Sequence, residues 1–421
     1  MMRIVCCPAM NLPDALDPET YYFSLYSPSG RGGVGHIAPT LCKEIIKKGL
    51  RPSVASWDFT TVALSVAASD KAVLRKDSSD GWTRIIDLTI YLREPVVWEM
   101  KRTELEALLR FLTGDFWSLH FLPGGVKPPE ANKFWKTDAD CVCLLSGGVD
   151  SLGGAIDLTS VGQKPLFVSQ VVRGDRANQE KFAAELDGHD RHCQWSGSIK
   201  HPGNSENSTR ARSIVFFAFA ILAASAISST KDHPVKIFVP ENGFISLNIP
   251  LGPNRIGSLS TKTTHPVYIE GIQTLWDALG IRAKLKLPYK YKTKGELLME
   301  CADQAKLVKL VGNSTSCGKY RRHNLTHCGT CLPCMVRRAA FLRAGLTDST
   351  VRGYCTERLA YSGSQDVAAT AAAYLRYQDQ GIRSFTGGYL SFAPNDRARY
   401  ENVVTRGMEE LGEFLRNQGV I

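Results

Sequence analysis

The sequence has no hydrophobic run long enough to cross a membrane. Its most apolar stretch, residues 213–227, falls short of the ~18 to 20 residues that a spanning helix needs. We therefore predict that this stretch forms a helix buried inside the protein. The first residues also lack a long apolar segment with a small-residue cleavage site, so we predict no signal peptide and a cytoplasmic location.

Long runs of Lys or Arg, and aromatic residues interleaved with them, are absent too. The net charge of +10 is dispersed along the 421 residues, which suits an anionic ligand or an acidic partner. Nucleic-acid binding is compatible with this charge, but no local pattern indicates it. The sequence contains no internal repeat, and its length predicts about two or three domains.

The most informative stretch that is present runs from Ser146 to Ser151. It follows residues 141–145, a short, continuous apolar run typical of a central strand in a parallel sheet. Two glycines allow a tight turn, and residues 153–158 continue into a helix whose N-terminus offers N–H groups to an anion. A simple tight turn is the alternative interpretation. We predict a phosphate site made by Ser146, Gly147, Gly148, Val149, Asp150 and Ser151.

This loop lacks the Gly-Lys-Ser/Thr ending of a Walker loop, so it supplies no lysine to terminal phosphates. Its S-G-G-x-D-S order resembles the loop of the PP-loop ATP pyrophosphatases. In that family the loop holds pyrophosphate while a substrate oxygen attacks the α-phosphate and forms an adenylated intermediate. The resemblance implies that ATP and Mg²⁺ are cofactors and that Asp150 helps to hold the magnesium ion.

Four of the twelve cysteines form a cluster with the spacing C-x10-C-x2-C-x2-C. In a chain without a secretion signal, such a cluster indicates a metal site rather than disulfides. We predict structural zinc, because four thiolates can close a tetrahedron around this ion. An iron–sulfur cluster is the alternative. His323 and His327 are candidate substitute ligands, although solvated loop residues are the simpler interpretation. The predicted ligands are Cys317, Cys328, Cys331 and Cys334.

The cysteine segment extends the resemblance. Residues 313–317 and 328–341 resemble the C-terminal part of the QueC-type 7-cyano-7-deazaguanine synthases, which pair this loop with such a quartet. The resemblance covers residues 138–354 and implies an α/β fold with an open parallel sheet of the adenine nucleotide α hydrolase type. It also implies a C–N ligase activity: adenylation of 7-carboxy-7-deazaguanine by ATP, followed by attack of ammonia to give the amide and then the nitrile.

Between the loop and the cysteines, two arginines open the apolar helix. Arginine is unfavourable at a helix start, so each requires an anionic counterpart. A nearby carboxylate would satisfy this requirement. The resemblance instead places Arg210, Arg212 and Ser213 beside the nucleotide, and we choose Arg212 as the catalytic one.

Two further segments carry candidate site residues. Residues 236–243 predict a strand that ends in a polar turn, and such strand ends bind ligands in open α/β sheets. Glu241 and Asn242 are therefore candidates, although they could simply cap the next segment. In residues 291–297 the resemblance brings Lys292 or Lys294 to the phosphates, and we choose Lys294. A solvated basic turn is the alternative.

Two segments depart from the typical synthases. Residues 168–176 replace a Tyr-Gly-Gln-Arg-His-like segment, and residues 258–266 replace a Tyr-Pro-Asp-Cys-Arg-like segment that serves deazaguanine contacts. These departures, with the appended segments, make the chain similar to the QueC-like proteins of multi-gene anti-phage defence systems, notably the Qat type. There, a partner protein could supply the amine. The candidate partners are ATP, a carboxylated 7-deazaguanine-like molecule, a protein of a defence operon and a second copy of the chain.

Three other functions stay open: a housekeeping synthase of queuosine biosynthesis, a tRNA-sulfurating PP-loop enzyme and a non-catalytic nucleotide-sensing subunit. Whichever applies, we predict three domains. Residues 1–135 form a mixed α+β accessory domain, 136–355 the PP-loop domain with its zinc knuckle, and 356–421 a helical extension.

Local patterns complete these domain predictions. In the first domain we expect strands over residues 61–66 and 83–92 with a turn at 77–81, a helix over 104–112, and a loop over the glycine-rich residues 30–36. In the last domain we expect helices over residues 366–379 and 400–417.

Overall fold

The computed structural model describes residues 2–171, 174–252 and 262–421. Five parallel strands form a central sheet in the order β8-β7-β6-β10-β11. Its middle strand β6 is completely buried, which confirms the prediction for residues 141–145. The bounds are β6 Cys141–Leu144, β7 Pro165–Gln170, β8 His192–Trp195, β10 Val235–Phe238 and β11 Ala283–Lys286.

The strand order reverses between β6 and β10. From β6 the chain runs outward through β7 and β8, and it then returns to place β10 on the other side of β6. In open parallel sheets, ligands bind beyond the carboxyl ends of the strands at such a switch point. The loop that follows β6 therefore lies at the position where this fold favours a ligand.

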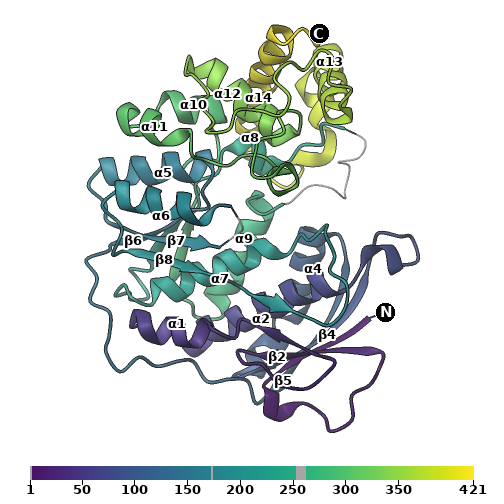
Figure 1. Cartoon of the computed structure of the whole chain (residues 1–421), viewed down its shortest axis with the longest axis vertical. Coiled ribbons are helices and arrows are strands. Elements are labelled where there is room, and N and C mark those ends of the chain that lie inside the picture. The colour runs from purple at the N-terminus through teal and green to yellow at the C-terminus, as the bar shows by residue number, and fades with distance from the viewer. Residues whose placement is uncertain (1, 172–173, 253–261) are drawn as a thin grey trace.

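Helices cover both faces of the central sheet (Figure 1). Helices α5 (Val149–Ser160) and α6 (Arg176–Glu185) lie on one face, and α7 (Arg212–Ala224) and α9 (Pro266–Ala278) lie on the other. Helix α7 is the predicted buried apolar helix. It is apolar on all sides because it packs against the sheet on one side and against helix α2 (Val54–Ala72) on the other.

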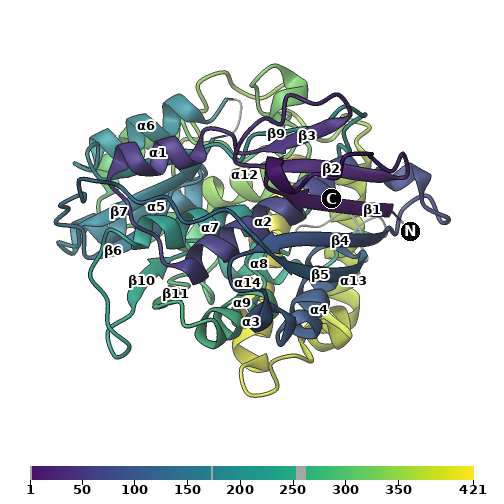
Figure 2. The same ribbon diagram turned by 90° about the horizontal axis from the view of Figure 1, so that it is seen from below.

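The N-terminal sheet has six strands in the order β5-β4-β1-β2-β3-β9, and Figure 2 shows it from below. The first five strands are parallel, so the expectation of a mixed α+β arrangement in residues 1–135 is corrected to an α/β arrangement. Strand β9 pairs antiparallel with β3 and comes from beyond residue 135. The bounds are β1 Met2–Cys7, β2 Thr20–Leu25, β3 Val34–Ile37, β4 Ile85–Leu92, β5 Phe116–Pro123 and β9 Ile199–Lys200.

The predicted strand over residues 61–66 is wrong, because these residues lie within helix α2. The hydroxyl residues Thr61 and Ser65 stand among apolar residues, but they are four positions apart, which is a helical spacing rather than the alternation of a strand. In the helix, the hydroxyl groups of Thr60 and Thr61 donate to the carbonyl groups of Ser56 and Trp57, four residues earlier. These bonds satisfy the hydroxyl groups of Thr60 and Thr61 inside an almost entirely buried helix, so these residues need no polar face.

The other local predictions in the N-terminal part agree with the structure more closely. Strand β4 lies within residues 83–92, and the predicted helix over 104–112 lies within α4 (Arg102–Thr113). Residues 30–33 are loop, but β3 already begins at Val34. The remaining helices are α1 Leu41–Lys48, α3 Pro95–Glu99, α8 Gly243–Leu247, α10 Lys294–Met299, α11 Gln304–Val311 and α12 Leu332–Ala344.

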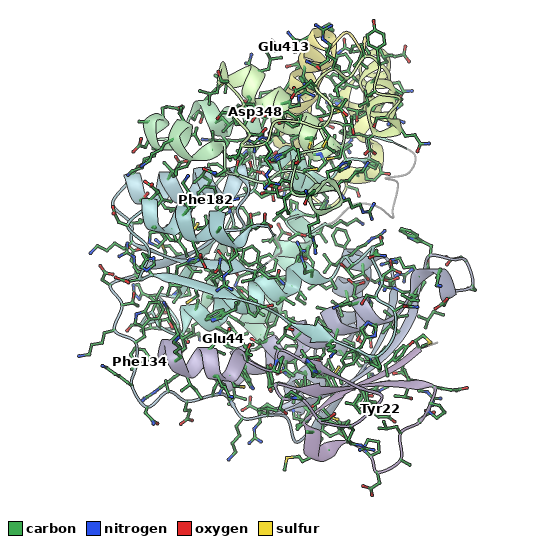
Figure 3. All side chains as sticks on the ribbon, in the orientation of Figure 1. Tyr22, Glu44, Phe134, Phe182, Asp348 and Glu413 are labelled. Carbon is green, nitrogen blue, oxygen red and sulfur yellow. The ribbon has the colours of Figure 1, made fainter. Side chains whose placement is uncertain are left out.

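The C-terminal extension packs onto the central unit. Helices α13 (Gln365–Thr386) and α14 (Arg397–Asn417) contain the two predicted helices, and their apolar faces share a core with α8 and α12. A second core joins the N-terminal sheet to α7 and the central strands. Figure 3 locates Tyr22 on the N-terminal sheet, Phe182 in the layer of α5 and α6, and Glu413 among the C-terminal helices. No helix in the described ranges is long and apolar enough to span a membrane.

Candidate functional site

The predicted loop forms a tight turn between β6 and α5. Gly147 has a φ of +95°, a backbone conformation that glycine adopts without strain. Gly148 is the N-cap of α5 in an extended conformation. The carbonyl of Gly147 accepts a hydrogen bond from the Thr315 N–H at 2.9 Å. The turn is thus tied to the segment that leads into the cysteine cluster.

Side chains of the loop and of α6 fix this turn. The Ser146 hydroxyl donates to the Ser151 hydroxyl at 3.0 Å, and Ser151 is also hydrogen-bonded to the Gly148 carbonyl at 3.0 Å. From α6, the Gln179 amide donates to the Ser146 carbonyl at 2.9 Å. The first N–H groups of α5 have no partner within their own helix and point beyond its N-terminus. This is the geometry that suits an anion.

Two glycines in α5 allow its close packing against neighbouring elements. A Cβ on Gly153 would lie 2.6 Å from Leu297 of α10, and one on Gly154 would lie 2.4 Å from Pro240 after β10. Larger residues would therefore separate α5 from both elements. The close approach places Lys294 and Glu241 next to the first turn of α5.

Asp150 is the centre of a buried polar group beneath the turn. Its Oδ1 lies 2.6 Å from Nζ of Lys294, and its Oδ2 accepts a hydrogen bond from the Asn242 amide at 2.8 Å. Asp150 is 4% exposed and Lys294 is 8% exposed. The predicted candidates from the loop, the β10 end and the 291–297 segment are therefore brought together.

The two carboxyl groups of this cluster have opposite pKa shifts. Burial opposes the ionisation of Asp150, but the Lys294 charge and the hydrogen bonds it accepts hold the Asp150 pKa below its usual value. Burial and the neighbouring Asp150 charge raise the Glu241 pKa well above its usual value. Opposite shifts of this kind favour the ionised form of Asp150 and the protonated form of Glu241. Both supply oxygen atoms, the ligand type that Mg²⁺ prefers.

Two cavities adjoin the turn and share Thr315. The smaller, which we call the loop cavity, has a volume of about 210 Å³ and is lined by the turn, Glu241, Lys294 and Pro333. The larger, which we call the basic cavity, has a volume of about 770 Å³. Its walls come from α2, the ends of β7 and β8, the start of α7 and the cysteine segment.

The three residues predicted at the start of α7 lie in different places. Arg212 lines the basic cavity. Arg210 is buried away from the loop, where it stacks over Trp82 at 4.8 Å and donates to the Thr113 carbonyl at 3.1 Å. The Ser213 hydroxyl is buried without a hydrogen-bond partner among the described residues. The structure thus brings Arg212, but not Arg210, to a cavity that adjoins the loop.

The anionic counterpart of this helix start is Asp70 of α2. Its Oδ2 accepts from the backbone N–H groups of Arg210 and Ala211 at 2.6 and 2.7 Å. A carboxylate at a helix N-terminus offsets the positive end of the helix dipole. For Arg210, the interpretation as a residue that is satisfied structurally therefore replaces a phosphate contact.

Of the two candidate lysines, only Lys294 lies at the loop. Lys292 pairs instead with Glu300 at 2.5 Å near the surface. The departures from the synthase pattern are only partly described: Val172 and Arg173, and residues 258–261 of the segment 258–266, lie outside the described residues.

The four predicted cysteines converge into a candidate metal centre. Their sulfur atoms all lie within 4.8 Å of one another, and all four residues are buried. The Cys328–Cys334 and Cys317–Cys331 sulfur pairs are each 3.9 Å apart. Tetrahedral zinc with Zn–S bonds of ~2.3 Å requires sulfur pairs ~3.8 Å apart. The quartet can therefore hold a zinc ion.

Backbone amides support this quartet. The Cys317 sulfur accepts from the N–H groups of Lys319 and Cys328 at 3.3 and 3.4 Å, and such contacts favour a thiolate. His327 is buried beside the quartet, and its Nε2 accepts from the Ser316 N–H at 3.2 Å. His327 is therefore neither a solvated loop residue nor part of the quartet, whereas His323 is exposed.

Three residues of the site were not predicted individually, although Thr315 lies in the segment 313–317 that carries part of the resemblance. Thr315 and Gln179 hold the turn, and Arg321 enters the basic cavity from the cysteine segment. Of these three residues, only Thr315 could have been predicted from the sequence, because it lies two positions before the first cysteine of the quartet. Comparisons with protein-family models, with curated proteins and with solved structures find no match.

Proposed function

We propose that this protein is an ATP-dependent ligase that adenylates a carboxylate and transfers the acyl group to an amine. The observation that carries the proposal is the Asp150–Lys294 pair beneath a double-glycine turn, at the start of α5 and at the switch point of the sheet. A turn in this place binds phosphate oxygen atoms through backbone N–H groups. The adjoining basic cavity leaves room for a second substrate.

In this proposal the loop residues hold pyrophosphate. Asp150 and Lys294 both line the loop cavity. The Lys294 ammonium group could therefore turn from Asp150 to phosphate oxygen atoms bound there. Asp150 and Glu241 would hold Mg²⁺, which neutralises phosphate charge when it is bound. Donors fixed before the reaction stabilise the charge that builds on the leaving pyrophosphate without reorganisation.

The proposed acid is a 7-deazaguanine carboxylate, and the product is an amide. The identity of the acid comes from the resemblance of the loop and of the cysteine segment to QueC-type synthases. We propose an anti-phage defence setting in which the amine belongs to a partner protein, because the chain adds an N-terminal sheet and two C-terminal helices to the region of resemblance. The cysteine quartet, with zinc bound, would brace the segment around Thr315.

Pyrophosphate release tests the adenylation step. Wild-type protein with ATP, Mg²⁺ and 7-carboxy-7-deazaguanine should form the acyl adenylate and release pyrophosphate, and added ammonia should then release AMP. Asp150→Ala should lower the rate by about 10²- to 10³-fold, the usual effect of losing one electrostatic stabiliser. Asp232→Ala, which changes an exposed aspartate, is the matched control and should retain the rate. ATP binding without pyrophosphate release would favour the nucleotide-sensing alternative.

The partner protein needs a separate test. Co-expression with neighbouring proteins of its operon, followed by intact-mass measurement, should reveal an added deazaguanine acyl group in the wild type and none with Asp150→Ala. An unmodified partner in both cases would contradict protein conjugation. Release of the free amide or nitrile with ammonia as the amine would favour the housekeeping synthase, and thiolation of tRNA would favour the sulfurating enzyme.

A further inference from the structure

The basic cavity brings together two arginines from distant parts of the chain. Arg212 begins α7, and Arg321 lies in the 3-10 turn Tyr320–His323 beside the cysteine quartet. Desolvation, followed by the positive charge of Arg321, lowers the Arg212 pKa. Like charges repel unless an anion lies between them. Both side chains are exposed, and neither guanidinium group has an ion-pair or hydrogen-bond partner in the part of the chain that the structure describes.

The acidic groups around this cavity are mostly occupied by other partners. Asp70 pairs with Arg84 at 2.5 Å and caps the start of α7. Glu206 accepts from the backbone N–H groups of Arg75 and Ser208 at 2.8 and 2.7 Å. Among the described residues, the single carboxyl group of Asp175 opposes the charges of both Arg212 and Arg321. Burial raises the Asp175 pKa, and its Oδ1 has no hydrogen-bond partner among the described residues. The two arginines therefore have an excess of positive charge.

Part of the cavity wall comes from helix α2 and strand β9, which belong to or pair with the N-terminal sheet region. Ala67 and Lys71 of α2 and Ile199 of β9 line the wall that does not belong to the central sheet. Lys71 is anchored there, because its ammonium group donates to the Ile199 carbonyl at 2.7 Å. A volume of about 770 Å³ is within the range of small-molecule sites. A ligand here would contact helix α2 of the N-terminal region as well as the central sheet and the cysteine segment.

We propose that Arg212 and Arg321 bind the carboxylate of the acid that is to be activated. Guanidinium groups recognise carboxylates through paired N–H donors. Phosphates already have a site at the turn, and Thr315, which lines both cavities, places the carboxylate next to a nucleotide bound there. The Thr315 hydroxyl is itself buried without a partner among the described residues. This assignment rests on the proposed function, since it names the site of the second substrate.

Selenate provides a direct probe, because its anomalous scattering locates it in crystals of the full chain. Wild-type protein should bind selenate between the two guanidinium groups. Arg321→Gln and Arg212→Gln should each weaken this binding by about tenfold to a hundredfold, the usual loss for a charged hydrogen-bond pair. Arg176→Gln is the matched control, because Arg176 is exposed and pairs with Glu180. Unchanged thermal unfolding of both variants would show that they fold.

Competition identifies the natural anion. The compound 7-carboxy-7-deazaguanine should displace selenate, and α,β-methylene-ATP should bind without displacing it. Displacement of selenate by the nucleotide analogue would assign the site to a phosphate and overturn the proposal. The proposal would also be overturned if the wild-type protein did not bind selenate, if Arg321→Gln still bound it, or if the acid did not displace it. A wild-type protein that holds selenate but does not bind the analogue would instead contradict the proposed function, while the anion site would stand.

Discussion

The two cavities that meet at Thr315 are built in different ways. The loop cavity is formed around one short turn, and the end of β10, α8, α10 and the cysteine segment supply the residues that complete it. The basic cavity joins α2 to the start of α7 and to the cysteine segment, which lie far apart in the sequence. The loop cavity is thus centred on one local motif. The basic cavity, by contrast, exists only when helix α2 of the N-terminal region packs against α7 and the central sheet. Variants that separate their effects test this difference.

Loss of zinc should have the largest effect, because the cysteine segment lines both cavities. Cys334→Ser removes one of four ligands, and structural zinc contributes on the order of 10 kcal/mol in isolated zinc-finger peptides. We expect less than one zinc per chain, a lower midpoint of thermal unfolding, and loss of both α,β-methylene-ATP and selenate binding. Metal analysis and calorimetry measure these quantities.

Cys355→Ser is the control for the zinc prediction. Cys355 is exposed and does not belong to the quartet, so this variant should keep its metal and both ligands. Iron in place of zinc in the wild-type protein would favour the iron–sulfur alternative. Full binding of both ligands after metal loss would show that the segment does not depend on the quartet.

Separating Asp150 from Lys294 should affect the loop cavity alone. Lys294→Met leaves a buried carboxylate without its partner, which costs about 3 to 5 kcal/mol in the free energy of unfolding. The double variant with Asp150→Asn should lose less, because no buried charge then remains. Both variants should lose α,β-methylene-ATP binding and keep selenate binding. Denaturant titration and calorimetry provide the two measurements.

Lys292→Met is the control for this pair. Lys292 forms a partly exposed ion pair with Glu300, so its loss should change the unfolding free energy by less than about 1 kcal/mol. Equal losses in Lys292→Met and Lys294→Met would argue against a special role for the buried pair.

The difference between the cavities also explains what the sequence could predict. The apolar run 141–145, the glycine turn and the cysteine spacing each depend on neighbouring residues, and the structure agrees with the strand, the turn and the quartet. Arg210 and Arg212 differ by only two positions, yet one faces Trp82 and the other the basic cavity. That distinction depends on how α2 packs against α7, which no local pattern contains.

The strand predicted over residues 61–66 was wrong for a related reason. In this part of α2 the hydroxyl groups of Thr60 and Thr61 bond to carbonyl groups of their own helix, so these polar residues do not mark a solvent face. Strand β9 has two residues and pairs with β3 of the N-terminal sheet, although it comes from beyond residue 135. So short an element gives no periodic signal, because its position is fixed by its partner β3.

Asp70→Asn should affect the basic cavity alone. Asp70 pairs with Arg84 and caps the start of α7 near Arg212. Asn retains one acceptor but not the charge, and Asp115 still pairs with Arg84 at 2.6 Å, so we expect a loss of about 3 kcal/mol in unfolding free energy. Selenate binding should weaken several-fold, while α,β-methylene-ATP binding stays unchanged. Asp77→Asn, which changes an exposed aspartate, is the control. Weaker nucleotide binding in Asp70→Asn would contradict the interpretation that the two cavities are built independently.

Glu410 of α14 should give the smallest effect, and one that depends on pH. It accepts a hydrogen bond from the Thr293 hydroxyl at the N-cap of α10, the helix that carries Lys294. Burial raises the Glu410 pKa to about 7; the Glu296 charge adds to this shift, while Arg343 and the bonds from Thr293 and the Gly295 N–H oppose it.

Because the folded protein binds this proton more tightly than the unfolded chain does, the resulting stability is complete below pH ~4.5 and is lost as the pH rises to about 7. The loss amounts to about 2 to 3 kcal/mol. Glu410→Gln should remove this part of the pH dependence, as measured by denaturant titration from pH 4 to 8, whereas Glu413→Gln on the exposed side of α14 should retain it. Since Glu410 supports Lys294, any accompanying change in ligand binding should concern α,β-methylene-ATP. A change in selenate binding would mean that α14 couples the two cavities, and they would then have to be regarded as one site.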